Sequence, residues 1–208
     1  LEFRRVLFRS AKEPLIRTRP FRAPHHTVSV QALTGGGRRP KPGEISLATG
    51  GILFIDEFPE FSRAALETLR QPLEEREVTV SRVEASVTYP ANFQLVAAMN
   101  PCPCGHFPDR SRCRCTDGQI TRYLQKVSGP MLDRIDICVE ASPITYGDIR
   151  SSGNNESSRE IRARVEQARK IQGERFAGEN IRCNGEMSGR HIRKFCWLGR
   201  EEEKFMEE

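Results

Sequence analysis

The stretch Gly51–Phe58, GILFIDEF, is the part of this chain that best indicates its fold. Ile52–Ile55 forms a continuous apolar run, with glycines before it and Asp56 and Glu57 directly after it. A short run of this kind is typical of a strand that is buried on both faces of a parallel sheet. Because ligands of open α/β sheets bind beyond the carboxyl ends of the strands, we expect the two acids to face a ligand.

The two adjacent carboxylates are suited to different tasks at a nucleotide site. Asp56 can hold the hydrated Mg²⁺ that bridges nucleotide phosphates, and Glu57 can orient and deprotonate an attacking water. The alternative is a buried strand that meets solvent through two solubilising acids. A second apolar run, Phe93–Ala98, precedes Asn100, whose amide can bind the γ-phosphate or the attacking water. An ordinary Asn-Pro turn is the alternative for Asn100. Taken together, the order of these features is that of an ATPase core.

Periodicity elsewhere predicts a mixed α/β domain. The apolar spacing after Ser62, the expected N-cap, predicts a helix that Pro72 bends or shortens near its end. Alternation over Glu77–Tyr89 predicts a β-hairpin, and Leu132–Val139 is expected to form a third strand. Strands that alternate with helices favour a mainly parallel sheet.

The last quarter of the chain is predicted to be helical. A polar linker, Arg150–Asn155, precedes a helix for which Ser158 is the expected N-cap. The expected apolar face of that helix comprises Ile161, Val165, Ala168 and Ile171.

Composition indicates an ordinary globular protein, with 37% hydrophobic and 29% charged residues among 208. No apolar run approaches the roughly 18 residues that span a bilayer, and no signal peptide is recognisable, so we expect a cytoplasmic protein without membrane segments.

Leu1–Ser10 resembles a translated sequencing adapter, and we exclude it as an expected artefact; a basic N-terminal arm is the alternative. Without its three arginines and one glutamate, the formal net charge of +5 falls to +3. Such a charge is compatible with nucleic-acid binding without requiring it.

Four cysteines form two closely spaced C-x-C pairs, Cys102 with Cys104 and Cys113 with Cys115. Four thiolates within so short a segment suit a tetrahedral Zn²⁺ site, which would be structural because no coordination position stays open. A disulfide pair, disfavoured in a reducing cytosol, and free thiols are the alternatives.

Three segments together resemble a known family: GGILFIDEFPEF, YPANFQLVAAMNPCPCGH and SGPMLDRIDI. They are similar to the magnesium-chelatase-like AAA+ ATPases of the YifB/ComM group. The resemblance implies an AAA+ P-loop-type fold with a helix-2 insertion in Arg22–Gly43, a pre-sensor hairpin in Glu77–Tyr89 and the start of a helical lid.

The same resemblance assigns roles to the candidate site residues. It makes Gly51–Glu57 the Walker B strand, with Asp56 on magnesium and Glu57 as the catalytic carboxylate of an ATP site. It makes Asn100 the sensor 1 residue. Arg134 matches the arginine finger, which would reach the γ-phosphate of a neighbouring subunit in a homo-oligomeric ring, expected to be a hexamer. The alternative for Arg134 is a surface ion pair with a neighbouring aspartate.

The sequence also departs from the family pattern. It contains no G-x-x-x-x-G-K-[ST] loop, and the Gly-rich stretch Gly35–Gly43 has no Ser or Thr that could hold magnesium. We therefore expect residues 11–150 to form a partial AAA+ core, and residues 151–208 a linker helix with a truncated lid that ends before sensor 2. The parent protein is expected to hydrolyse ATP, whereas these 208 residues alone are not.

Three functions remain open at this stage. The first is a DNA-remodelling or branch-migration motor in recombination or transformation, for which Arg38, Arg39 and Lys41 would touch the phosphate backbone; a solvated loop explains these residues equally well. The second is a chelatase-type subunit that drives metal insertion. The third is a zinc-stabilised nucleic-acid-binding module. His25 and His26 can contact a nucleotide, a subunit or DNA, or be plain loop residues.

Overall fold

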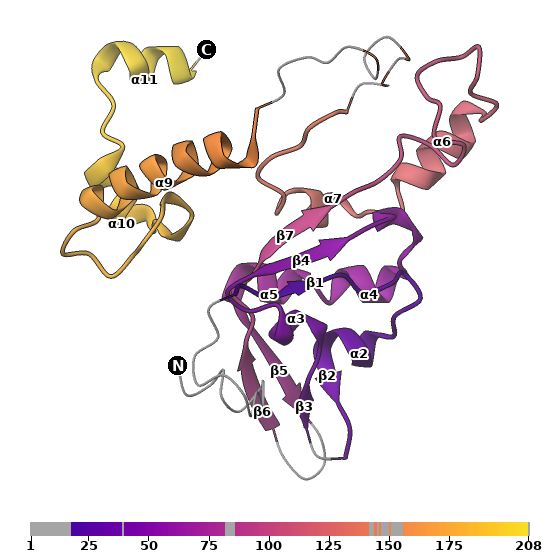
Figure 1. Ribbon diagram of the computed structural model, residues 1–208, viewed down its shortest axis with the longest axis horizontal. Coiled ribbons are helices and arrows are strands. Elements are labelled where there is room, and N and C mark those ends of the chain that lie inside the picture. Colours follow the sequence, from indigo (N-terminus) through magenta and orange to yellow (C-terminus); the bar gives the residue numbers. More distant parts are fainter. Residues whose placement is uncertain are drawn as a thin grey trace. The chain divides into compact units, whose positions relative to one another are not determined.

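The computed structural model describes residues 18–38, 40–81, 86–141, 144, 146, 150 and 156–207 (Figure 1). The chain divides into two compact units, Leu1–Glu140 and Ala141–Glu208. The expected artefact at Leu1–Ser10 and the candidate residue Arg39 lie outside the described residues.

A parallel three-stranded sheet forms the centre of the first unit. Its strands are β1 (Phe21–Arg22), β4 (Ile52–Ile55) and β7 (Gln94–Ala97), in the order β1-β4-β7 (Figure 1). Strand β4 is parallel to both neighbours, with Ile55 opposite Ala97 at the end of the ladder. The two strands predicted from their apolar runs and the mainly parallel α/β fold are therefore confirmed.

Only one face of strand β4 is fully buried. Leu53 and Ile55 are 0% exposed, whereas Ile52 and Phe54 on the other face are half-buried. The Phe54 ring stacks 6.0 Å from Phe21, which is itself exposed. The prediction of burial on both faces is thus wrong, because Leu53 and Ile55 belong to the buried core whereas Ile52 and Phe54 do not. That core includes Leu33, Ile45, Ala65, Leu66, Leu69 and Met131.

The helix predicted after Ser62 is divided in two. The Ser62 hydroxyl caps α4 (Arg63–Glu67) by accepting from the Ala65 N–H at 3.2 Å, as expected. A second helix, α5, runs from Arg70 to Glu75. The break lies earlier than predicted because Pro72 lacks the N–H that would bond the carbonyl of Thr68, so the helical ladder is interrupted there. A shorter helix, α3 (Glu44–Leu47), contributes Ile45 to the same core.

Two antiparallel hairpins lie outside the sheet. The predicted hairpin is formed by β5 (Glu77–Ser81) and β6 (Ser86–Pro90), although its turn lies outside the described residues. Helix α2 (Val30–Thr34) leads into a smaller hairpin, β2 (Gly35–Gly36) with β3 (Lys41–Pro42). The Tyr89 hydroxyl of β6 donates to the Pro40 carbonyl at 2.9 Å, which joins the two hairpins.

The third predicted strand, Leu132–Val139, is not present. Helix α7 (Gly129–Leu132) ends at Leu132, the first residue of the predicted strand, and the described residues after it form no strand. Ile137 and Val139 are 78% and 85% exposed. An extended segment without a ladder partner or a covered face gains neither hydrogen bonds nor burial, so its β-like pattern does not suffice.

The second unit is helical. It contains α9 (Ser158–Arg175), the 3₁₀ turn η2 (Asn184–Glu186), α10 (Gly189–Phe195) and α11 (Arg200–Glu207). Ser157, rather than the predicted Ser158, caps α9 in a capping box with Glu160. The predicted apolar face of α9 is about half exposed, and this helix buries no residue fully. No helix in the described part of the chain is long and apolar enough to span a membrane.

Candidate nucleotide site and cysteine cluster

The ends of β4 and β7 are joined beyond the last residues of the strands. The Ala98 N–H donates to the Ile55 carbonyl at 2.9 Å, and the Phe58 N–H donates to the Ala98 carbonyl at 3.0 Å. Asp56 and Glu57 leave β4 between these two bonds, and Asn100 follows two residues after Ala98. The structure therefore brings all three candidate residues to the same edge of the sheet, where all three are exposed.

Glu57 has an unusual backbone conformation. Its φ of 52° and ψ of 44° lie in the left-handed region, which is costly for a residue with a side chain. The turn is held from both sides, because the Glu57 N–H donates to Asp56 Oδ1 at 2.9 Å and Phe58 and Pro59 of the 3₁₀ turn η1 (Phe58–Glu60) are buried. Backbone strain of this kind concentrates at functional sites.

His26 contacts the candidate catalytic carboxylate. Its Nδ1 lies 2.8 Å from Glu57 Oε2, with the two side chains 31% and 56% exposed. The centres of the His25 and His26 rings lie 4.0 Å apart, and the Phe61 ring lies 6.5 Å from His26 in a T-shaped arrangement. Sequence analysis missed this contact. The sheet register is consistent with this contact, because Arg22 is opposite Leu53, and His26 and Glu57 each follow four residues later in the chain.

Arg134 is held within its own chain. Its guanidinium pairs with Glu74 of α5, and Nη1 also donates to the Pro130 carbonyl. Nε is buried without a hydrogen-bond partner, and the side chain is 23% exposed. The structure thus ties Arg134 to α5 rather than bringing it to Asp56 and Glu57.

The basic candidates Arg38 and Lys41 are exposed on the small hairpin. Lys41 lies in β3, and Arg38 lies in the turn that precedes it. Both side chains are therefore accessible to a large ligand.

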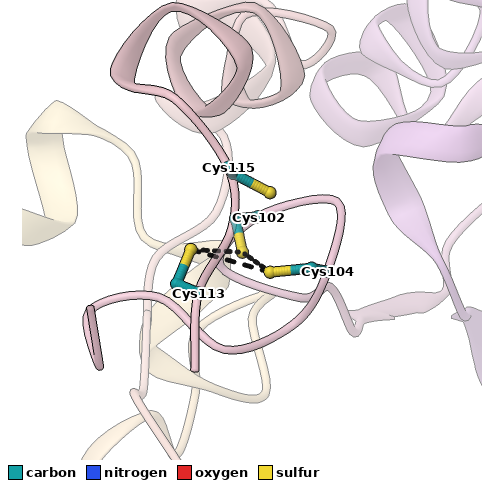
Figure 2. A group of neighbouring side chains, drawn as sticks. All are labelled: Cys102, Cys104, Cys113 and Cys115. Carbon is teal, nitrogen blue, oxygen red and sulfur yellow. Dashed lines mark hydrogen bonds between the residues drawn. The ribbon is translucent and has the colours of Figure 1, made fainter. Parts of the chain in front are cut away.

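The four clustered cysteines converge on one point (Figure 2). The Sγ atoms of Cys102, Cys104 and Cys113 lie 3.4 to 3.8 Å apart, and all four sulfurs are within 4.8 Å of one another. No disulfide joins them. Cys102 is fully buried and Cys113 nearly so, whereas Cys104 is exposed.

Backbone geometry distinguishes the thiols from one another. The backbone N–H of His106 hydrogen-bonds to the Cys104 sulfur and, with other donors, lowers the pKa of that thiol to about 6. Burial raises the pKa of Cys115 to about 11. The loop therefore stabilises negative charge at Cys104 and opposes it at Cys115.

The oxygen donors at the sheet edge fit magnesium. Mg²⁺ prefers carboxylate and water oxygens and uses one or two carboxylates together with substrate phosphates. Asp56 and Glu57 supply such oxygens from exposed positions, and the amide of Asn100 adds a neutral polar group. The soft sulfur cluster is a different type of site, suited to zinc or iron–sulfur chemistry.

Comparison with known proteins assigns the family. The sequence profile described as "Magnesium chelatase, subunit ChlI" matches residues 2–149, and the profile for the C-terminal part of that subunit matches residues 155–208. The competence protein ComM of Haemophilus influenzae is 47% identical over 92% of this chain, and the uncharacterized protein YifB of Escherichia coli is also 47% identical over 92%. The chain spans 37% of the length of each of these relatives.

Two more distant similarities are also found, one to a curated protein and one to a solved structure. The magnesium-chelatase 67 kDa subunit of Heliobacterium mobile is 28% identical over 68% of this chain and 20% of its own length. A crystal structure of NtrX from Brucella abortus in complex with ADP shares 21% identity over 38% of this chain and 19% of that chain, with a TM-score of 0.33, too low to support an argument. On the evidence of the matching profiles, the chain belongs to the magnesium chelatase ChlI family.

Proposed function

We propose that this chain supplies the hydrolytic half of an ATP site. The observation that carries the proposal is the joined ends of β4 and β7, which bring Asp56, Glu57 and Asn100 to one edge of a parallel sheet. Ligands of such sheets bind at that edge. Family membership supports an ATPase independently.

Each residue has a role that its chemistry suits. Asp56 would hold Mg²⁺, which when bound neutralises charge on the nucleotide phosphates. Glu57 would orient the attacking water and accept its proton, and Asn100 would donate an amide N–H to the γ-phosphate or to that water. His26, in contact with Glu57, would have to release or share that carboxylate during turnover. Because the sequence has no G-x-x-x-x-G-K-[ST] loop, hydrolysis is proposed for the full-length protein rather than for these 208 residues.

A matched pair of variants in the full-length protein tests the catalytic carboxylate. Glu57→Gln removes the base and keeps the shape, so we expect hydrolysis to fall at least about 100-fold while ATP binding persists. Glu60→Gln is the control, since Glu60 lies three residues away and pairs with Lys126 at 3.1 Å. Hydrolysis by Glu57→Gln at the rate of the control would refute the mechanism.

We further propose that Arg134 acts on the nucleotide of a neighbouring subunit in a ring, expected to be a hexamer. Its partner Glu74 is 52% exposed, so the pair is accessible for exchange of partners. A mixture of Glu57→Gln and Arg134→Ala subunits tests this idea, because the first retains the arginine and the second retains the carboxylate. We expect the mixture to be more active than either variant alone. A mixture that stays as inactive as its components would contradict action between subunits.

DNA is the polymer that we propose the parent ATPase remodels, for example by branch migration in recombination or transformation. The similarity to a competence protein and the exposed Arg38 and Lys41 support this choice. DNA affinity of the full-length protein should fall with rising salt, and the double variant Arg38→Ala, Lys41→Ala should reduce the slope of that dependence. DNA binding that is absent at low salt would favour the chelatase-type function, to which the Heliobacterium mobile relative points.

We propose the reducing cytoplasm as the compartment, as it keeps the clustered thiols reduced.

A further inference from the structure

The sulfur positions match the geometry of a single tetrahedral metal ion. With zinc–sulfur bonds of about 2.3 Å, the edges of a tetrahedron of thiolates are about 3.8 Å long. The three closest Sγ pairs measure 3.4, 3.6 and 3.8 Å, and Cys115 completes the set within 4.8 Å. Disulfide sulfurs would be about 2.0 Å apart. Figure 2 shows the four side chains, each from a different position of the loop, gathered around one point.

The loop that carries these cysteines has little else to hold it in one conformation. Between the end of β7 at Ala97 and the start of α6 (Asp117–Leu124), the chain forms neither helix nor strand. Its small core consists largely of the cysteines themselves: Cys102, Cys113 and Ile120 are buried, with Phe107 and Cys115 packed against them. A core of that size contributes little apolar burial for so long a loop, so a cross-link would add strongly to its order.

Two hydrogen-bond donors lie beside the cysteines. The Phe107 N–H donates to Cys102 Sγ at 3.4 Å. The Arg110 guanidinium donates to the Cys115 carbonyl at 3.2 Å, lies 5.0 Å from the centre of the Phe107 ring and pairs with Asp117. Such supporting contacts orient metal ligands.

We propose that the four cysteines bind one structural Zn²⁺ ion and that this ion holds Asn100 in place at the sheet edge. The ligands are Cys102, Cys104, Cys113 and Cys115. Zinc is favoured because four thiolates within one compact tetrahedron suit a single ion and leave no open position for catalysis.

Two contacts connect the metal loop to Asn100. A Cβ atom on Gly105, inside the loop, would lie 3.9 Å from the side-chain Cγ and Oδ1 of Asn100, so the loop backbone lies against that amide. The Asn100 backbone also lies near the hydroxyl of Tyr123 in α6, on whose pKa it acts. Helix α6 begins directly after the last ligand, where Thr116 forms a capping box with Gln119. The ion would thereby order both groups that hold Asn100. The role of the ion in positioning Asn100 for hydrolysis rests on the proposed ATP site.

Metal analysis of the 208-residue chain, purified under reducing conditions, tests the site. We expect about one equivalent of zinc per chain, lost on Cys102→Ser or Cys113→Ser and retained in Cys183→Ser, whose cysteine is exposed and outside the cluster. Cobalt substitution should produce the absorption of a tetrahedral cobalt–thiolate centre. Because a serine variant can fail to fold, the zinc content of the unaltered chain is the measurement that tests the site. Less than about half an equivalent of zinc, or iron in its place, overturns the proposal.

Hydrogen exchange with and without the metal tests the positioning of Asn100. After removal of zinc by a chelator, we expect faster exchange in residues 99–124, while the amides of β4 keep their protection, and we expect readdition of zinc to restore the original pattern. Unchanged exchange around Asn100 after complete loss of zinc would overturn the positioning role. Neither measurement depends on ATP hydrolysis, so failure of the ATPase proposal is detected separately by Glu57→Gln.

Discussion

Replacing the candidate catalytic Glu57 with glycine is expected to change the stability of the first unit little and to raise it slightly. Glu57 occupies the left-handed region at φ 52°. That conformation costs a residue with a side chain about 1–2 kcal/mol and costs glycine almost nothing. The strain persists because the buried Phe58 and Pro59 hold the turn, and we interpret it as the consequence of needing a carboxylate at this position.

Two losses offset this gain. The greater freedom of glycine in the unfolded chain costs about 0.4–1 kcal/mol. The contact with His26 contributes at most about 0.5 kcal/mol, because the two side chains are 31% and 56% exposed. The net change for Glu57→Gly is therefore between about −0.5 and about +1.6 kcal/mol, with a central value of about +0.5 kcal/mol. Glu75→Gly is the control, since Glu75 ends the helix α5 in an ordinary helical conformation; glycine there costs about 1 kcal/mol and also removes the carboxylate that accepts from Gln71 Nε2 at 2.6 Å.

The two variants should differ in stability by roughly 1.5 kcal/mol, about a tenfold difference in the unfolding equilibrium. Hydrogen exchange of the β4 amides is the appropriate assay, because Trp197, the single tryptophan, is 82% exposed in the second unit and does not report on the sheet. If Glu57→Gly destabilised β4 as much as Glu75→Gly does, the argument from backbone strain would be refuted.

Two further predictions concern burial and pH. Leu53→Ala, at a position with 0% exposure, should cost roughly 3 kcal/mol, whereas Val96→Ala, at 37% exposure, should cost less than about 1 kcal/mol; equal losses in exchange-derived stability would contradict a sheet covered on one face. The hydrogen bond from Lys194, and to a smaller extent the charges of Arg190 and His191, lower the pKa of Glu179 from its usual 4.5. The ionised Glu179 therefore contributes stability above pH 4.5, and this contribution is lost as the pH falls through the lower pKa of the folded state. Thermal unfolding between about pH 6 and about pH 3 should therefore depend less on pH in Glu179→Gln, and an unchanged acid transition would contradict this role.

Local pattern was sufficient for the elements whose stability is decided nearby. The apolar run Ile52–Ile55 coincides with β4, and the Ser62 cap and the β5–β6 hairpin form where they were predicted. The C-x-C spacing also predicted that four sulfurs would converge. In each case the determining interactions lie within a few residues of one another.

Several features of the candidate site depend on partners that are distant in the sequence. Strand Leu132–Val139 was wrongly predicted because a β-like pattern does not provide a neighbouring strand, and one face of β4 stays half-exposed because coverage depends on where helices pack. The partner of Arg134 proved to be Glu74, sixty residues earlier in the chain.

The sequence by itself determined which residues end the strands and therefore which chemistry is available at the sheet edge. Only the tertiary structure decided that His26 meets Glu57, that Glu57 is held in a strained conformation, and that the cysteine loop lies against Asn100. The physical reason is that alternation and apolar runs report the environment of single segments. Contacts between segments follow from sheet register and buried anchors such as Phe58, which act across the whole fold.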